Sequence, residues 1–461
     1  MCRSTTLCRA LCAVALLSFA RPVMTQAPSG GAVLFEGARL IPGDGAPAIE
    51  DSAFLVERGT IVRVGRKGQV TPPAGAARVD LSGKTVMPAL INTHGHPGFQ
   101  KGLTYVQENF TRENVITDLN RSYYFGVAAL QSQGIEKGDI TYQVRADQAA
   151  GRLGGTRLLV AGRGLGAPNA GPGAAAYAGI AYEVTTEADA RRSVQDLAAR
   201  KVDLIKIWVD DRNGRAPRLG SDLYRAIIDE GHRHGLRVNA HVYYHRDAVD
   251  LVNAGIDAFA HLTRDLEMDD ALVAAIVKRN VYVMANISGS ERGTYAQLPP
   301  WLSEGDPMLA LLRESVPPAV IQRMQGFFAP REPAQVERSR AAYGILQRSV
   351  AKLNAAGAKL ILGADTGTQD HLFGFAEHRE LEVMVKAGMS PAQGIVAATS
   401  RAAEFLKLDQ MGSLVAGKQA DFLVLDANPL DDITNTRRIS RLYIKGMQVD
   451  RGALRAALVG S

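Results

Sequence analysis

The sequence contains little cysteine and few aromatic side chains. Only three of its 461 residues are cysteines, all within the first 12 positions, and Phe, Trp and Tyr together make up 6% of the chain. A disulfide-dense scaffold and a zinc site built from thiolates are therefore excluded for the rest of the chain. With 46% hydrophobic and 22% charged residues, the composition is that of a folded globular protein rather than a disordered one.

Apolar runs long enough to span a bilayer are also missing. The apolar run Ala10–Ala20 is too short, and it lies between a basic start and the small-residue site Thr25–Ala27, the layout of a secretory signal peptide. We therefore expect residues 1–27 to be removed and the protein to be secreted or periplasmic; the alternative is a retained N-terminal anchor. Three arginines without any acidic residue lie in this segment, so the net charge of +6 indicates export rather than nucleic-acid binding.

The remaining chain divides into two kinds of pattern. Residues 28–87 and 409–461 consist of short strand patterns separated by turns, whereas residues 88–408 alternate apolar strand patterns with amphipathic helical stretches. Such alternation predicts βαβ units around a buried parallel sheet, and about eight units fit this length. We expect an α/β fold, a (β/α)8 TIM barrel with a small β-sandwich domain built from both ends of the mature chain. A doubly wound open sheet is the alternative.

One segment interrupts the alternation. Residues 286–333 contain seven of the 20 prolines and delay the next strand pattern. Long insertions after a strand serve as lids or binding loops, or they are tolerated on the surface. Both interpretations remain open.

Two His-x-His pairs occur among the nine histidines. His232 and His234 precede a glycine at the end of a helical pattern, where cations and glycine favour helix termination. His94 and His96 instead follow the apolar run Val86–Ile91, and strand alternation places both imidazoles on the same side of the strand end. Two neutral imidazoles that face the same way form half of a metal site.

Other metal-type side chains follow further strand patterns. His241, His261 and Asp365 stand at the carboxyl ends of apolar runs, the face on which barrel enzymes place their sites. Lys206 lies inside the apolar run Leu204–Trp208, where an unpaired ammonium is costly.

Three states of Lys206 are compatible with its position. The side chain extends to the strand end, pairs with Asp210 or Asp211, or has reacted with CO2 to form a carbamate. A carbamate is anionic and has two oxygens that can bridge two metal ions.

These residues stand in motifs that resemble the amidohydrolase superfamily of metal-dependent hydrolases, in particular its imidazolonepropionase-related and Xaa-Pro-dipeptidase-like branch. The resemblance extends over essentially the whole mature sequence. The matching segments are Met87–His96, Ile205–Ile207, Ala240–His241, Ala254–His261, Gly363–Thr366 and Gly412–Asp421. Residues 163–173 lack a Gly-Gly-His motif and residues 135–140 lack a Thr-Thr-Val-Arg-Asp run that many relatives carry. Both departures leave the metal ligands intact and concern the substrate region.

The resemblance implies a ligand set for two divalent metal ions. His94, His96 and Asp365 would bind the first ion. His241 and His261 would bind the second, and a CO2-derived carbamate on Lys206 would bridge the two. Asp365 would also be the catalytic residue that takes the proton of a metal-bridging hydroxide and passes it to the leaving group. Zinc is the expected metal because two imidazoles per ion suit it best.

We therefore expect an exported metal-dependent amidohydrolase that hydrolyses an amide or other C–N bond of a dipeptide, an N-acyl amino acid or a cyclic amide. The alternatives are a mononuclear deaminase with an unmodified lysine, a lactone or ester hydrolase on the same scaffold, and a non-catalytic binding protein. The expected partner is a small-molecule substrate. Assembly into a homo-oligomer is left open, and neither nucleic acid nor stable membrane insertion is expected.

The candidate substrate contacts are less specific. Tyr243, Tyr244 and His245 follow the metal-ligand histidine on the same loop, so one of them could bind the substrate carbonyl. His371 and Arg379 are further candidates, whereas His378 is expected to be solvated on a helix. The basic candidates for a substrate carboxylate are Lys101, Arg163 and Arg292.

Overall fold

A computed structural model describes residues 31–173, 177–212, 214–328, 330–368 and 371–459. The predicted signal peptide, residues 1–27, lies outside the described residues. Within the described part of the chain, we find no helix with the length and apolarity that crossing a membrane requires.

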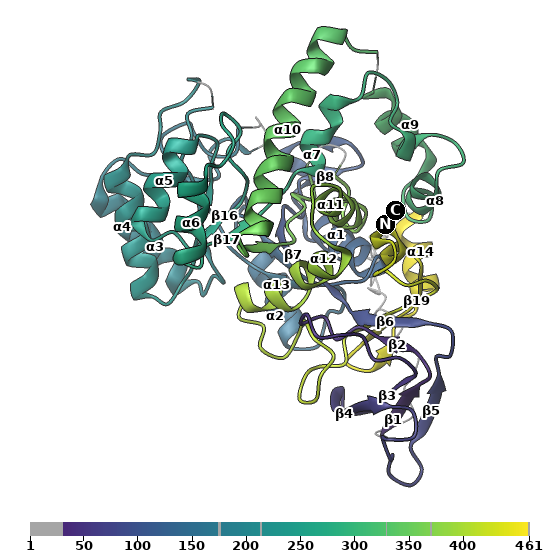
Figure 1. Ribbon diagram of the computed structural model, residues 1–461. Coiled ribbons are helices and arrows are strands. Elements are labelled where there is room, and N and C mark those ends of the chain that lie inside the picture. Colours follow the sequence, from purple (N-terminus) through teal and green to yellow (C-terminus); the bar gives the residue numbers. More distant parts are fainter. Residues whose placement is uncertain (1–30, 174–176, 213, 329, 369–370, 460–461) are drawn as a thin grey trace, which may run out of the picture.

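Parallel strands form the centre of the larger domain (Figure 1). One sheet has the order β11-β10-β7, and a seven-stranded sheet has the order β13-β12-β14-β15-β16-β17-β18. The bounds are β7 (Leu90–Gly95), β10 (Val127–Ser132), β11 (Arg157–Leu159), β12 (Leu165–Gly166), β13 (Tyr182–Glu183), β14 (Ile205–Trp208), β15 (Val238–His241), β16 (Ala258–Phe259), β17 (Tyr282–Met284) and β18 (Lys359–Ile361).

Backbone hydrogen bonds connect the two sheets at both seams. The Thr93 amide donates to the Leu362 carbonyl at 2.9 Å, which joins β7 to the end of β18. The Asp203 amide donates to the Val160 carbonyl at 2.8 Å, which joins the end of β11 to the start of β14. An open doubly wound sheet would not bring its first and last strands together, so the strand order is that of the predicted TIM barrel.

Helices follow most of the barrel strands and surround them (Figure 1). They are α1 (Arg112–Tyr124), α2 (Ile140–Ala149), α3 (Glu187–Ala199), α4 (Ser221–Arg233), α5 (His245–Ala254), α6 (Asp270–Lys278), α10 (Pro333–Ala355), α11 (Phe375–Lys386), α12 (Pro391–Ala398) and α13 (Ser400–Phe405). Helix α4 ends at Arg233, and the His232 imidazole lies 2.8 Å from a carboxylate oxygen of Asp257. His234 is the C-cap residue of α4, so the helix end predicted at His232 and His234 is confirmed.

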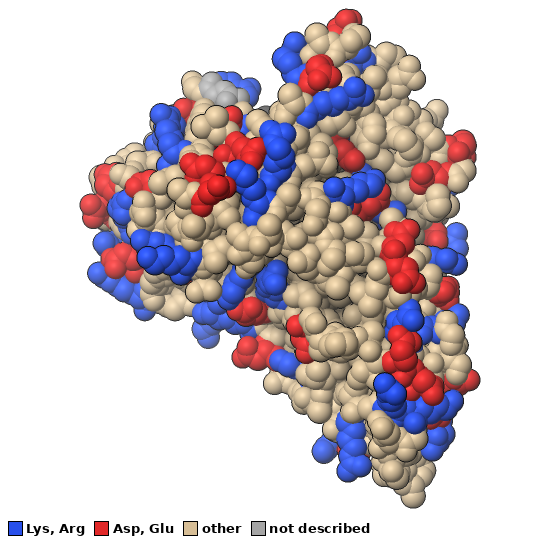
Figure 2. Space-filling view, viewed as in Figure 1, with Lys and Arg blue, Asp and Glu red and all other residues tan. Residues whose placement is uncertain are grey.

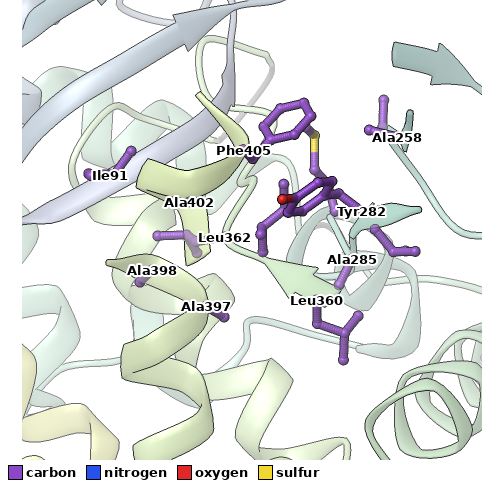
Figure 3. Close-up of a cluster of buried hydrophobic side chains, with 14 of the residues drawn as sticks. Ile91, Ala258, Tyr282, Ala285, Leu360, Leu362, Ala397, Ala398, Ala402 and Phe405 are labelled. Carbon is purple, nitrogen blue, oxygen red and sulfur yellow. The ribbon is translucent and has the colours of Figure 1, made fainter. Parts of the chain in front are cut away.

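The core between β18 and the last barrel helices fixes where β18 ends (Figure 3). Leu360 and Leu362 are fully buried, and the Leu362 amide donates to the Ala397 carbonyl of α12 at 3.0 Å. The rings of Tyr282 and Phe405 lie 5.0 Å apart between centroids. Small side chains on α12 and α13 let these helices approach the strand closely, and this packing holds the residues that follow β18 in place.

Strands from both ends of the chain form the β-rich second domain (Figure 1). Its sheets have the orders β4-β3-β1-β5 and β2-β6-β19-β20-β21, and β6 pairs antiparallel with β19 from the other end of the chain. The bounds are β1 (Val33–Glu36), β2 (Arg39–Leu40), β3 (Ser52–Glu57), β4 (Thr60–Arg66), β5 (Ala77–Asp80), β6 (Thr85–Pro88), β19 (Phe422–Leu425), β20 (Ile439–Ile444) and β21 (Met447–Gln448). The exact domain boundaries at residues 87/88 and 408/409 remain predictions.

The insertion at residues 286–333 carries the short helices α7 (Ser288–Glu291), α8 (Pro307–Arg313) and α9 (Pro318–Gly326). Its first residues enter the site described below. On the face shown in Figure 2, Lys and Arg lie interspersed with Asp and Glu, so this face has no continuous basic stripe of the kind that binds nucleic acid.

Candidate metal centre and active site

Four imidazoles and a carboxylate meet at the carboxyl ends of the barrel strands. The Nε2 atoms of His94 and His96 lie 3.2 Å apart, and Oδ1 of Asp365 lies 2.9 Å from the His96 Nε2. The His261 ring lies 5.1 Å from the ring of His94 and 4.5 Å from that of His241, between centroids. The donor atoms of His94, His96 and Asp365 all lie within 4.8 Å of one another, the spacing that a single metal ion requires.

Burial favours the neutral form of three of these imidazoles. It lowers the pKa of His94, His241 and His261 well below the usual value, and neighbouring positive groups lower each pKa further. A metal ion binds the neutral form of imidazole, so the burial that would destabilise an imidazolium favours a metal ligand.

Asp365 has two unusual properties. Its backbone φ is 49°, a left-handed conformation that costs a non-glycine residue energy and is concentrated at functional sites. Burial alone would raise the pKa of its carboxyl group, but His94 and His96 outweigh burial and lower that pKa well below its usual range. Its side chain is 28% exposed, compared with 1% for His94, so the carboxylate reaches the cavity.

Lys206 is buried, and no acidic residue in the described part of the chain lies within ion-pair distance of its ammonium group. Its relative exposure is 1%, so it does not extend into solvent. Asp210 instead pairs with His241 Nε2 at 3.3 Å, and Asp211 accepts from the Tyr244 hydroxyl at 2.7 Å. Burial lowers the pKa of the Lys206 ammonium to about 7, so much of the amine is uncharged near neutral pH. Lys206 is therefore neither exposed at the strand end nor in an ion pair with Asp210 or Asp211, the two acids named as examples of a partner.

Gly134 makes room for Lys206. Its φ is 87°, and a Cβ atom at this position would lie 2.9 Å from the Cβ and the Cγ of Lys206. We expect Gly134→Ala to displace the lysine stem and to strain the backbone at the same time. The variant should bind less metal than the wild type and should unfold at a lower temperature, as measured by elemental analysis and thermal denaturation. Gly138→Ala is the control, because it adds the same methyl group at a similar φ of 63° in open space. Unchanged metal content in Gly134→Ala would contradict this role.

Two asparagines that sequence reasoning missed orient the first ligand pair. The Asn92 Oδ1 accepts from the amide of His94 at 2.9 Å and from that of Ala364 at 3.3 Å, which ties the end of β7 to the segment after β18. Asn286 contacts the His94 Nδ1 at 2.7 Å through its side-chain amide. The sequence signal for Asn92 was its position two residues before His94, whereas Asn286 gave no signal before the barrel was assembled.

The metal-type side chains line a cavity of about 380 Å³. This size suits a small-molecule substrate. Its lining consists of His94, His96, Pro172, Tyr177, Lys206, Trp208, Arg212, His241, His261, Arg264, Asn286, Gly289, Ser290, Asp365, Thr368 and His371. All six metal-ligand candidates are therefore brought together, and the insertion contributes Asn286, Gly289 and Ser290.

The predicted substrate contacts after His241 lie beside this cavity rather than on its lining. Tyr243 and Tyr244 pack against each other with ring centroids 4.9 Å apart. The backbone amide of His245, the first residue of α5, donates to an Asp265 carboxylate oxygen at 2.8 Å. A substrate role for these three residues stays a prediction, and the geometry favours other side chains.

The remaining candidates have separate places. His371 lines the cavity, and its Nδ1–H donates to the Ala364 carbonyl at 3.1 Å. Arg379 is buried in ion pairs with Glu291 and Glu382. The expectation that His378 is solvated is wrong, because its exposure is 1% and its Nε2 lies 3.0 Å from the Phe125 carbonyl.

None of the three basic residues predicted to hold a carboxylate lines the cavity. Arg163 donates to the carbonyls of Ile180 and Ala181. Lys101 lines a different cavity, and Arg292 lies in a short 3-10 helix of the insertion. Arg212 and Arg264, which the sequence did not single out, are the arginines of the cavity.

The residues present fit a divalent metal centre. Neutral imidazoles and a carboxylate are the donors that zinc and similar ions prefer. The buried His96 Nδ1 has no hydrogen-bond partner among the described residues, whereas the Nε2 of the same ring faces the donor atoms of His94 and Asp365.

Comparison with known proteins decides the family. The family model described as "Amidohydrolase family" matches residues 85–449. The chain belongs to the amidohydrolase family. The predicted superfamily is thus confirmed, and with it a hydrolase whose family acts on small molecules and generally uses divalent metal ions.

Solved structures of amidohydrolases confirm the predicted fold. A proposed prolidase from Bifidobacterium longum has a TM-score of 0.72 at 25% identity, covering 93% of this chain and 99% of that chain. A Xaa-Pro dipeptidase with bound methionine also has a TM-score of 0.72, at 20% identity, covering 91% of this chain and 99% of that chain. The fold is a TIM barrel with a β-rich domain.

A similar curated protein has a name that gives no activity. An uncharacterized protein of Mycobacterium tuberculosis is 29% identical over 219 residues, which are 45% of this chain and 55% of that protein. The match thus spans about half the length of this relative.

Proposed function

We propose that this amidohydrolase is an exported enzyme that hydrolyses an amide or other C–N bond of a small substrate with the help of two divalent ions, most simply zinc. The observation that carries the proposal is the convergence of six metal-type side chains from five strands and their ends on one cavity. The signal-peptide pattern of residues 1–27 supports export.

Each of the metal-ligand candidates has a proposed role. His94, His96 and Asp365 would hold one ion, His241 and His261 would hold the other, and Lys206, as a carbamate, would serve both. Divalent ions held here would supply electrophilic activation of the scissile carbonyl and of water. Asp365 would accept a proton from the attacking water and deliver it to the leaving nitrogen, because its carboxylate is both ionised and exposed to the cavity.

Two observations support a carbamate on Lys206. The amine is fully buried among groups that offer it no carboxylate within ion-pair distance in the described chain, and its lowered pKa leaves it nucleophilic. The neutral amine would add CO2 through a new N–C bond and release one proton to solvent, and the positive charge of two metal ions would stabilise the resulting carbamate anion.

The bond class rests on the relatives as well as the site. The similar structures include proteins described as a prolidase and a Xaa-Pro dipeptidase, and both names denote hydrolysis of a C–N bond. The test is a panel of N-acyl amino acids, dipeptides, cyclic amides and lactones, assayed with the zinc-loaded protein. We expect turnover of amide substrates that is lost on chelation and restored by zinc. Turnover of lactones alone would contradict the bond assignment.

A mononuclear hydrolase or deaminase is the second candidate. His94, His96 and Asp365 are sufficient in number and spacing to hold one ion without Lys206. In that case the lysine would stay unmodified, and its replacement would leave both metal content and turnover largely intact.

A further inference from the structure

Two arginines reach the cavity beside the metal ligands. Arg264 follows His261 by three residues, and its backbone amide donates to the Tyr243 carbonyl at 2.8 Å. Arg212 lies in the loop after β14, where its backbone amide donates to an Asp210 carboxylate oxygen at 3.1 Å. Both side chains are half-buried and line the cavity.

Neither guanidinium has a carboxylate within ion-pair distance among the described residues, although Asp210 acts electrostatically on both and Asp365 on Arg264. Asp210 lies 3.3 Å from the Nε2 of His241, whose neutral imidazole does not cancel the carboxylate charge. By contrast, Arg218 in the same loop pairs with Asp247, and the buried Arg379 pairs with two glutamates.

A partly desolvated cation whose acidic neighbours lie beyond ion-pair distance is only incompletely compensated in the free protein. Guanidinium stays protonated in proteins, so loss of charge cannot relieve this cost. The charge of Arg264 also acts on the metal-ligand side of the cavity, because it is among the groups that lower the pKa of His241 and His261. With bound divalent ions, the cavity would be strongly positive and would attract an anion.

The backbone also makes room for Arg212. A Cβ atom at Gly173 would overlap the guanidinium of Arg212, and Gly173 has a φ of 81°. Glycine at position 173 thus leaves space for the guanidinium in the position that it occupies here, and the φ of 81° favours glycine as well.

We propose that Arg264 and Arg212 bind a carboxylate of the substrate, which restricts the enzyme to N-acyl amino acids or peptides with a free carboxyl group. This inference rests on the proposed function, because it names the substrate class of the same site. A planar guanidinium binds a carboxylate through two parallel hydrogen bonds, so two arginines can fix the position of the acid group while the amide faces the metal ligands. The apolar surfaces of Pro172, Tyr177 and Trp208 in the same lining suit the rest of the substrate.

The first experiment compares matched substrates. N-benzoyl amino acids with a free carboxyl group are assayed beside their C-terminal amides, which differ only in the charge. We expect the wild type to prefer the acids, and Arg264→Met and Arg212→Met each to raise KM for the acids by about 10- to 100-fold, the worth of a charge-assisted hydrogen bond. Turnover of the amides should change little. A wild type without preference for the acids would overturn the proposal.

Arg215→Met is the matched control. Arg215 lies in the same loop and loses the same charge, but it is exposed and does not line the cavity. It should keep the wild-type preference for the acids. If Arg215→Met raises KM for the acids as strongly as Arg264→Met does, the effect reflects the loss of positive charge in general, and the proposal is wrong. Arg264→Lys serves as the variant that preserves folding. Its KM for the acids should lie between the values of the wild type and Arg264→Met, because lysine keeps the charge without the planar guanidinium.

The second experiment measures binding without catalysis. A carboxylate also binds metal ions directly, so N-benzoylglycine is titrated calorimetrically into metal-free wild type and variants whose folding has been checked by circular dichroism. Binding should weaken by about tenfold or more in Arg264→Met and stay unchanged in Arg215→Met. Equal binding of N-benzoylglycine and its amide to the metal-free wild type would overturn the arginine role.

The two failures are distinguishable. If the zinc-loaded wild type cleaves neither acids nor amides, the proposed function fails, while the titration still decides whether the arginines bind a carboxylate. If it cleaves acids and amides equally well, the proposed function stands and the carboxylate requirement is wrong.

Discussion

Asp365→Asn is expected to lower kcat by about 10³- to 10⁴-fold, the upper part of the range for general acid–base catalysis, with little loss of bound metal. Asparagine has the same size, tolerates the left-handed φ of 49° at this position and keeps one oxygen toward the metal site. It cannot take up a proton from water. The measurement is kcat on the best amide substrate, together with elemental analysis of the same preparation.

A carboxylate-to-amide change elsewhere controls for this result. Asp270→Asn alters an exposed residue of the first turn of α6 and should leave turnover unchanged. A fully active Asp365→Asn enzyme would remove the proton-transfer role of Asp365. A variant that loses turnover and all metal together would show instead that the carboxylate is needed only as a ligand.

Lys206→Met is expected to lose about half of the bound metal and to reduce turnover by about 10³-fold or more, because methionine cannot react with CO2 to supply an anionic ligand between the ions. The side chain it replaces is buried at 1% exposure, and methionine has a similar length without the charge. Metal content and kcat are measured on protein expressed and purified in parallel with the wild type.

Two further experiments, with the variant Lys206→Glu and with added bicarbonate, distinguish carbamate formation from a packing role of Lys206. Glutamate places a carboxylate near the same position and should recover part of the metal that Lys206→Met loses. Metal-free wild type should regain activity faster when zinc is added with bicarbonate than with zinc alone, whereas Lys206→Glu should not respond to bicarbonate. Wild-type turnover in Lys206→Met would rule out the carbamate and favour the mononuclear enzyme.

The sequence indicated that most of the metal-ligand candidates share one face because strand ends are recognisable from local pattern; their roles as a ligand set came from the family resemblance. His94, His241, His261 and Asp365 each follow an apolar run, and parallel strands bring their carboxyl ends to one face of a barrel. These four positions needed no knowledge of loop paths. The same argument extends to the fold, since the alternation of strand and helix patterns specifies the barrel.

The residues that sequence reasoning missed lie where loops decide the geometry. Arg212 and Arg264 reach the cavity only through the course of the loops after β14 and β16, and one chain contains many arginines with no local mark of function. Asn286 lies at the start of the insertion and contacts His94, which is 192 residues earlier in the sequence. The burial of His378 was missed for a related reason, because its neighbour Thr436 belongs to the C-terminal segment.

The most direct test of the dinuclear centre is the metal content of the wild-type protein, measured by elemental analysis alongside amide turnover during stepwise zinc reconstitution. We predict two zinc ions per chain at saturation, with activity that rises as the second ion binds. Full activity at one ion per chain, or turnover that persists in protein free of metal, would contradict the account.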